Sequence, residues 1–245
     1  MAVTTPKKTG FEKWQDTINL AASDPGWNAW DCEIQTAVSE YNRHLSGTAN
    51  YRQLDWHLIK AIAWVETGAE SRKWGTNMMQ IGNPGDPGLR ALLTGNEGGE
   101  LIIPAPWKSR LTLGSAVTVP SHNIRAGVGY LLMRLANYSN QTVLDPDAAI
   151  YEVAVQSGDS MSRIAAAKGS TVEIMQRLNP SARVLRIGQV LKYQKGSVRK
   201  VITGWKPITT SNIATYYNVG DKDYAKKLDY ALVVMRTGKG VACAR

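Results

Sequence analysis

The sequence predicts an α+β protein in which a mainly α-helical domain is interrupted by a small βααβ module. Apolar residues recur at helical spacing before residue 150 and after residue 195, while the segment between begins and ends with alternating, strand-like residues. The chain has 245 residues, of which 43% are hydrophobic. It is therefore long enough to bury the core of one large domain or of two small ones.

Several classes of protein are disfavoured by composition. No apolar run is long enough to cross a bilayer, so we expect a soluble protein without membrane insertion. The opening stretch MAVTTPKKTGFEKWQD has lysines but no apolar segment behind them, which predicts that no secretory signal peptide is present. The two cysteines, Cys32 and Cys243, have no metal-ligand spacing, so neither a metal nor a cofactor is expected. The sequence does not decide whether Cys32 and Cys243 form a disulfide.

The charge points to an anionic polymer as partner. The net charge is +9, and most of it is carried after residue 149. Nucleic acid and cell wall are both anionic polymers. The basic residues are scattered rather than interleaved with aromatic residues on one face, so nucleic-acid binding is not expected. The chain has eight Trp and ten Tyr but a single Phe. Trp and Tyr combine a flat apolar face with a polar edge, which favours stacking on sugars.

A helix predicted from Asp55 to Gly68 carries an unexpected carboxylate. Ile59, Ile62 and Glu66 are spaced i, i+3 and i+7, so Glu66 shares the apolar face of the helix. Asp55 can cap the start, and Gly68 places Glu66 in the last turn. Burial and the helix C-terminus both disfavour a charged carboxylate there. For most helix-end glutamates the side chain simply bends out to water.

The inserted module spans residues 150–195. Tyr151, Val153 and Val155 alternate as a strand, and two short helices follow, the first capped by the turn that ends at Ser160 and the second by Thr171. Asn179-Pro180 ends the second helix, and a closing strand ends at Tyr193. The order of its motifs resembles a LysM domain: Y-x-V, G-D-S-M, I-A, L-N-P and G-Q-V-L. LysM domains bind N-acetylglucosamine-containing glycans such as peptidoglycan. The resemblance implies a groove between the first strand–helix loop and the second helix–strand loop, around residues 158–161 and 179–183. Its implied binding residues are Gly158, Asp159, Ser160, Met161, Asn179 and Pro180.

The segments on either side of the module resemble the goose-type lysozyme and soluble lytic transglycosylase superfamily. Four motifs occur in family order: AIAWVETG ending at Glu66, NMMQIG with Met79, Gln80 and Ile81, Asn123-Ile124-x-x-Gly127, and Tyr216-Tyr217-Asn218-x-Gly220. The chain departs from the family at Thr67, where serine is usual, at Asn77, where glycine is usual, and at Tyr216, where alanine is usual. The resemblance implies a discontinuous lysozyme-like domain and peptidoglycan as the substrate.

In that family the helix-end glutamate is the catalytic acid. By resemblance Glu66 protonates the oxygen between N-acetylmuramic acid and N-acetylglucosamine, and its partly desolvated position would keep the proton at neutral pH. Met79 and Gln80 are implied to line the cleft beside it, with Tyr217 and Asn218 opposite. An inverting hydrolase also needs a second carboxylate as base, for which Asp86 is the candidate. A lytic transglycosylase needs no second carboxylate. The position of Asp86 before Pro87 fits an ordinary turn residue at least as well as a catalytic base.

The predicted organisation is an N-terminal helical extension (1–50), the first part of the lysozyme-like domain (51–149), the LysM domain (150–195) and the second part (196–245). Helical periodicity predicts that Ile124, Val128, Leu131, Leu135 and Tyr138 share one face before the module. The junctions are predicted at Asp145-Pro146 and at residues 195–197.

The hypothesis from the sequence is a muramidase with a built-in wall anchor, made in the cytoplasm and active in the periplasm or cell wall of a target bacterium. Inserted-LysM muramidases of this kind resemble antibacterial effectors of the type VI secretion system, which implies a cognate immunity protein and a secretion-machinery component as partners. The alternatives are a phage-type lysin, a lytic transglycosylase, and a non-catalytic peptidoglycan-binding protein.

Overall fold

The computed structural model describes residues 7–68, 72–147, 149–237 and 243. The chain divides into two compact units: unit 1 comprises Met1–Asn137 and Ile202–Arg245, and unit 2 comprises Tyr138–Val201. The first part of unit 1, before the chain enters unit 2, contains α1 (Gly10–Ser23), η1 (Pro25–Asn28), α2 (Asp31–Leu45), α3 (Trp56–Thr67), η2 (Arg72–Gly75), α4 (Gly88–Thr94), α5 (Gly99–Ile102), η3 (Ala105–Trp107), α6 (Leu113–Thr118) and α7 (Pro120–Leu135). The remaining elements are β1 (Ala136–Leu144), β2 (Tyr151–Ala154), α8 (Met161–Ala167), α9 (Val172–Leu178), β3 (Val190–Tyr193), β4 (Gly196–Trp205), α10 (Thr210–Tyr216) and α11 (Tyr224–Thr237). This is a mixed α+β structure, as the sequence predicts.

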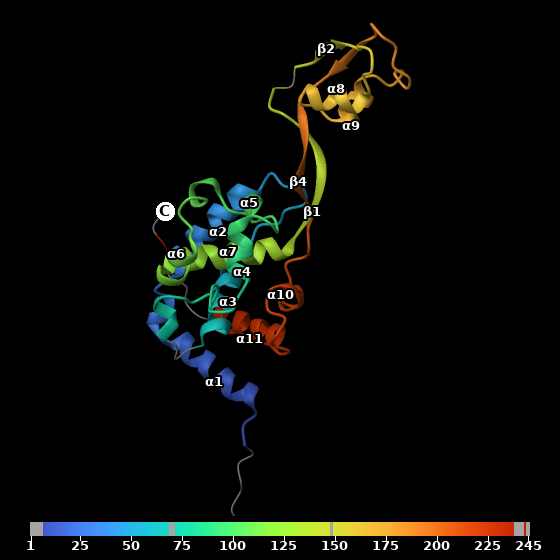
Figure 1. Ribbon diagram of the computed structural model, residues 1–245. Helices are drawn as coiled ribbons and strands as arrows, with labels where there is room; N and C mark the ends of the chain where they lie inside the picture. The colour runs from blue at the N-terminus through green and yellow to red at the C-terminus, as the bar shows by residue number, and fades with distance from the viewer. Residues whose placement is uncertain (1–6, 69–71, 148, 238–242, 244–245) are drawn as a thin grey trace, which may run out of the picture. The chain divides into compact units, whose positions relative to one another are not determined.

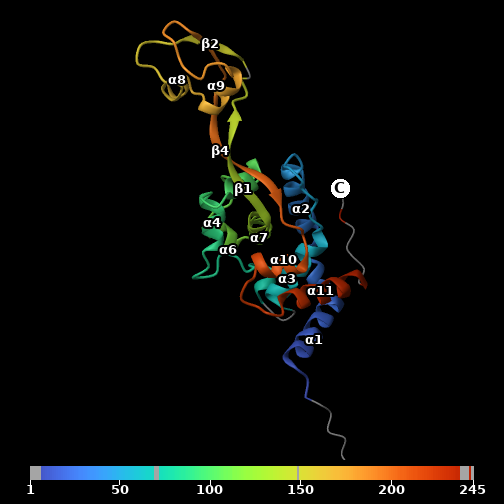
Figure 2. The same cartoon turned by 90° about the vertical axis from the view of Figure 1, so that its right-hand side faces the viewer.

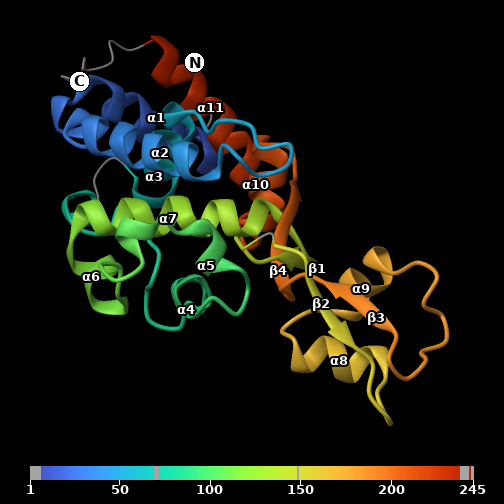
Figure 3. The ribbon, with the colours of Figure 1, turned by 90° about the horizontal axis from the view of Figure 1, so that it is seen from above.

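Unit 1 is built around α7 and α3. Figure 3 shows α7 between α2 on one side and α4, α5 and α6 on the other, and α7 contacts each of them. The second group is α3, α10 and α11, which lie together in Figure 2. Fully buried side chains from these helices, including Ile34, Ile59, Ile124 and Leu228, form the core. The apolar face predicted for the helix at residues 55–68 is thus an inward face of α3.

Ion pairs attach α2 to both of its neighbours. Lys60 of α3 lies 2.6 Å from Asp31 at the start of α2, and both side chains are almost completely buried. Arg125 of α7 is buried and bonds the half-buried Glu33 and Glu40 of α2, with Nε–Oε2 at 2.7 Å to Glu40. Removal of Lys60 or Asp31 alone would leave an uncompensated buried charge, at a cost of roughly 3–5 kcal/mol. Residues 1–50, predicted as an N-terminal extension, therefore contribute α2 to the core of unit 1.

The chain passes between the units within a pair of strands, which corrects two predictions. The helix predicted to reach Tyr138 ends at Leu135, and Tyr138 lies in β1. Likewise Gly196 and Ser197, predicted as a junction, begin β4. The main-chain amide of Asp145 donates to Lys195 at 3.1 Å, and that of Lys206 donates to Leu135 at 2.8 Å, so the strands run antiparallel. Pairing with a strand about sixty residues away overrides the helical spacing of the sequence.

Unit 2 has the predicted βααβ order. Strands β2 and β3 are antiparallel, with Tyr151 opposite Tyr193 and Val153 opposite Leu191. Figure 1 shows α8 and α9 together on one side of these strands. Side chains from α8, α9, β3 and the connecting segments form one small core: Val155, Ile164, Ala165, Met175, Ala182 and Leu191. Val153 of β2 packs against it. The predicted caps are present, since Ser160 accepts from the amide of Arg163 and Thr171 from that of Ile174.

The two cysteines form a disulfide. Cys32, near the start of α2, is bonded to Cys243, and their Cα atoms are 5.4 Å apart across a sequence separation of 211 residues. The sequence left this bridge open, and disulfides of this kind persist mainly in oxidising compartments. Within the described residues, no helix has the length and apolar character required to span a membrane.

Candidate active site

The site is built on the C-terminal end of α3. Asp55 caps the helix by accepting from the amide of His57, and Gly68 ends it with a φ of 74°, a conformation that glycine adopts without strain. Both ends were predicted from the sequence and are confirmed. Glu66 consequently lies in the last turn, and its side chain is half-buried.

The Glu66 carboxyl is held by two donors from the C-terminal segment. The Tyr224 hydroxyl donates to Glu66 Oε1 at 2.6 Å, and Asn218 Nδ2 donates to the same oxygen at 3.2 Å. Burial is the main cause that raises the pKa of Glu66 above its usual value, and nearby Asp221 adds to the rise. The two hydrogen bonds, and the cation of Lys227, act in the opposite direction. The carboxyl therefore holds its proton to a higher pH than an exposed glutamate.

Gln80 and Met79 form the segment facing Glu66. Gln80 has a φ of 48°, which is rare for a residue with a side chain, and its Nε2 donates to the main-chain oxygen of Glu66. Met79 is buried, and its amide donates to Asn123 Oδ1 at 2.8 Å. Gly127 lies against Met79, because a Cβ at that glycine would stand 2.6 Å from Met79 Cβ. The second and third motifs of the sequence are thus in direct contact.

The departures from the family motifs have identifiable partners. Asn77, which stands where glycine is usual, accepts from Asn123 Nδ2 at 2.5 Å and donates to Asn83 Oδ1 at 3.2 Å. Asn83 in turn donates to the main-chain oxygen of Gln80 at 3.0 Å. Thr67, in the serine's place, keeps the hydroxyl and donates to the Met78 carbonyl at 2.5 Å. These hydrogen bonds fix the loop that carries Gln80.

The fourth motif closes the site from the other side. Tyr217 follows the last residue of α10, and its hydroxyl lies 3.5 Å from the Met79 carbonyl oxygen. Burial is the main cause that raises the pKa of Tyr217 well above its usual value, so the phenol remains a neutral donor. Its ring centroid is 5.6 Å from that of Tyr130. The result is a cleft of about 170 Å³, lined by Glu66, Met79, Gln80, Ile81, Asp86, Tyr130, Tyr217 and Asn218.

Two of the groups at this site were not expected from the sequence. Tyr224 recurs at helical spacing with Leu228, which is typical of an ordinary core residue, and its hydroxyl contact with Glu66 joins positions 158 residues apart. Tyr130 lies on α7 among apolar residues and gave no signal of its own. In each case the one indication in the sequence was a tyrosine, with its polar hydroxyl, on an otherwise apolar helix face.

Asp86 lines the same cleft and also organises its loop. Its Oδ1 accepts from the Gly88 amide at 2.8 Å and its Oδ2 from the Gly82 amide at 3.0 Å. Both carboxylate oxygens therefore hold the turn between residues 82 and 88. The turn role considered from the sequence is present, and the position in the cleft keeps Asp86 within the candidate site.

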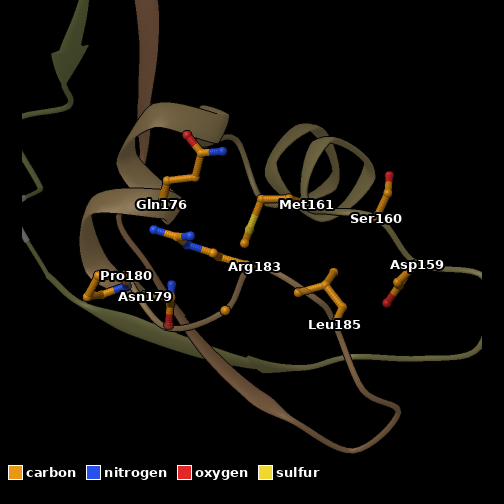
Figure 4. Close-up of a pocket in the computed structure, with 9 residues that line it drawn as sticks. Asp159, Ser160, Met161, Gln176, Asn179, Pro180, Arg183 and Leu185 are labelled. Atoms are coloured by element: carbon orange, nitrogen blue, oxygen red, sulfur yellow. The ribbon is translucent and has the colours of Figure 1, made fainter.

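Unit 2 has its own groove of about 530 Å³ (Figure 4). It lies between the loop before α8 and the loop after α9, where the sequence predicted it. Of the predicted residues, Asp159, Ser160, Met161, Asn179 and Pro180 line it. Gly158 is not a lining residue: its φ is 80°, and its carbonyl accepts from Arg163. Ala182 and Arg183, which also line it, fall within the predicted stretch 179–183, whereas Gln176 and Leu185 were not predicted.

Comparison with known families identifies unit 2. Residues 153–193 match the LysM domain family, and they contain α8, α9, β3 and the second half of β2. This part of unit 2 is therefore a LysM domain, a class of peptidoglycan-binding module. No curated protein and no solved structure matches the chain.

Proposed function

We propose that the chain is a peptidoglycan-cleaving muramidase whose LysM domain holds it on the cell wall. One observation carries this proposal: Glu66, with a raised pKa, lines a cleft together with residues from the second and fourth motifs. A carboxyl that holds its proton to a higher pH than usual, in a cleft lined by polar and aromatic side chains, is suited to act as the general acid in cleavage of a glycosidic bond. Loss of turbidity of purified sacculi measures this activity directly.

In this mechanism Glu66 supplies the proton for the leaving oxygen. Because Tyr224 and Asn218 both donate to Oε1, the proton is carried by Oε2, the oxygen without a donor among the described contacts. The anion left after proton transfer is stabilised by the same two hydrogen bonds. Gln80, tied to the main chain of Glu66, and Tyr217, near Met79, are placed to position the sugar on either side of the carboxyl.

The fate of the cleaved sugar depends on Asp86. We propose that it acts as the base that activates water, since it shares the cleft with Glu66 and its orientation is fixed by two main-chain amides. Hydrolysis should then give muropeptides with a free reducing end. Mass spectrometry of the soluble products checks this expectation.

A second candidate, lytic transglycosylation, is favoured by the fact that both Asp86 oxygens already accept hydrogen bonds within the loop. In that reaction the muramoyl 6-hydroxyl attacks, and the products are one water lighter. Anhydromuramic ends on the soluble products of the unmodified chain would overturn hydrolysis and leave Asp86 with its turn role alone.

The proposed biological role is that of an antibacterial effector, such as one injected by a type VI secretion system and blocked by an immunity protein; a phage lysin is the alternative. Support comes from the disulfide, which suits the oxidising compartment where the substrate lies. We expect expression in the cytoplasm to be tolerated and fusion to an export signal to lyse the host. The exported Glu66→Gln chain is the control. Equal toxicity in both compartments would point to another target.

A further inference from the structure

The LysM groove carries opposite charges at its two ends. Asp159 and Arg183 are the charged residues among those that line it. In Figure 4 Asp159 lies at one end beside Ser160, whereas the Arg183 guanidinium extends to the other, below Gln176 and near Met161. A neutral chitin strand has no ionic group to match either end. A peptidoglycan strand does, because N-acetylmuramic acid carries a lactyl branch that ends in a carboxylate or in a carboxylate-bearing stem peptide.

The local fold fixes the Asp159 carboxylate and the main chain of the loop that carries Arg183. Asp159 Oδ2 accepts from the Gln156 amide at 2.8 Å, which holds the carboxylate on the turn before α8. The loop that carries Arg183 is fastened by Asn179, whose side chain exchanges two hydrogen bonds with the main chain of Lys192, at 2.7 and 2.8 Å. Ala182, next to Arg183, is 7% exposed and belongs to the core of unit 2.

The Arg183 side chain is available to a ligand. It is exposed, and among the described residues no hydrogen bond or ion pair engages its guanidinium. By contrast Arg163, on α8, donates to the Gly158 carbonyl at 2.9 Å and stabilises the turn. A guanidinium can bind a carboxylate through two parallel hydrogen bonds, which gives geometric selectivity as well as attraction.

We infer that Arg183 is a specificity residue that reads the carboxylate on the lactyl branch of the glycan, while Asp159 keeps carboxylates from the opposite end. The groove thereby prefers the alternating peptidoglycan strand to chitin and binds it in one direction. This inference rests on the LysM assignment and deepens the proposed function. It does not require that unit 1 be catalytic.

The test is a comparison of dissociation constants, by calorimetry, for three glycans of equal length. These are a chitin oligosaccharide, a peptide-free peptidoglycan oligosaccharide with lactyl carboxylates, and the same strand with stem peptides. The full chain is used in its Glu66→Gln form so that no ligand is cleaved. We expect one or both carboxylate-bearing strands to bind about three- to tenfold more tightly than chitin, as one partly exposed charge-assisted contact allows. If the peptide-free strand binds more tightly, Arg183 binds the lactyl carboxylate. If the strand with stem peptides binds more tightly, Arg183 binds a carboxylate of the peptide.

Arg183→Gln should remove the preference, so that the ratio of the dissociation constants for chitin and for the carboxylate-bearing strands approaches one, while Arg183→Lys should keep part of it. Arg186→Gln is the matched control, because Arg186 is an exposed arginine of the same segment that does not line the groove. Added salt should weaken the preference. Equal binding of all three glycans, a preference that survives in Arg183→Gln, or no binding of any strand would each overturn the inference. None of these outcomes depends on cleavage, so they are distinguishable from failure of the proposed muramidase activity.

Discussion

Glu66→Gln should retain the fold and lose lysis of purified sacculi by on the order of 10²–10⁴-fold, the range in which general acid catalysis contributes. Glutamine has the same shape, and its oxygen can still accept from Tyr224 and Asn218, so the local hydrogen bonds survive. What is lost is the proton. Turbidity assays at matched protein concentration, with circular dichroism to verify folding, measure the effect.

Tyr224→Phe supplies the matched control for this variant. The hydrogen bond from Tyr224 lowers the pKa of Glu66, so its removal should raise that pKa further. Since the acid must be protonated to act, activity falls as the pH rises through this pKa. The alkaline limb of the pH–rate profile should therefore move to higher pH in Tyr224→Phe, while Glu66→Gln stays inactive at every pH. Residual activity above about a tenth of wild type in Glu66→Gln would refute the assignment, because general acid catalysis contributes at least about 10²-fold.

The parts of the site that were predictable from the sequence are those set by local rules. Asp55 and Gly68 fix the ends of α3 through capping and a left-handed glycine, so the position of Glu66 on the helix follows from its neighbours in the chain. The same applies to unit 2, where Ser160 and Thr171 cap two short helices between alternating strands. Short-range patterns of this kind are readable without tertiary information.

What could not be predicted depends on contacts between distant segments. The sequence pattern alone predicts Tyr224 to be a core residue. Its hydrogen bond to Glu66 forms because α11 packs on α3. The packing of α2 into the core could not be predicted either, because the sequence does not show that Asp31 forms a buried ion pair with Lys60 of α3. Tyr138 continues a helical spacing, yet the strand that pairs with β1 lies beyond the whole LysM domain. No single-sequence pattern records such pairings.

Excision of the LysM domain should leave a folded, Glu66-dependent enzyme with a specific loss of performance on intact wall. The pairing of β1 with β4 shows where to cut. The Asp145 amide donates to the Lys195 carbonyl at 3.1 Å, and Arg199 lies 2.6 Å from Asp145. Residues 145 and 195 are therefore joined by a main-chain hydrogen bond where the two strands end, and a short turn can connect them. Replacement of residues 146–194 by Asn-Gly would convert β1 and β4 into a hairpin.

The thermodynamic cost of this change is expected to be small. The main core of unit 1 and the ion pairs of Lys60 with Asp31 and of Arg125 with Glu40 lie outside the excised segment. The loop between the strands becomes shorter, and loop-closure entropy varies only slowly with loop length. A single cooperative thermal transition in the shortened chain checks that unit 1 remains folded.

The activity of the shortened chain should then depend on the substrate. Binding through the LysM domain raises the local concentration of enzyme on its polymer, so its loss should reduce lysis of sacculi at low enzyme concentration by about ten- to a hundredfold. Small soluble glycan fragments, which gain nothing from anchoring, should be cleaved within about twofold of the full chain on the same argument. Glu66→Gln in the shortened chain is the control for residual activity. An unfolded product, or equal loss on both substrates, would mean that the LysM domain is part of the catalytic machinery and not an anchor attached to it.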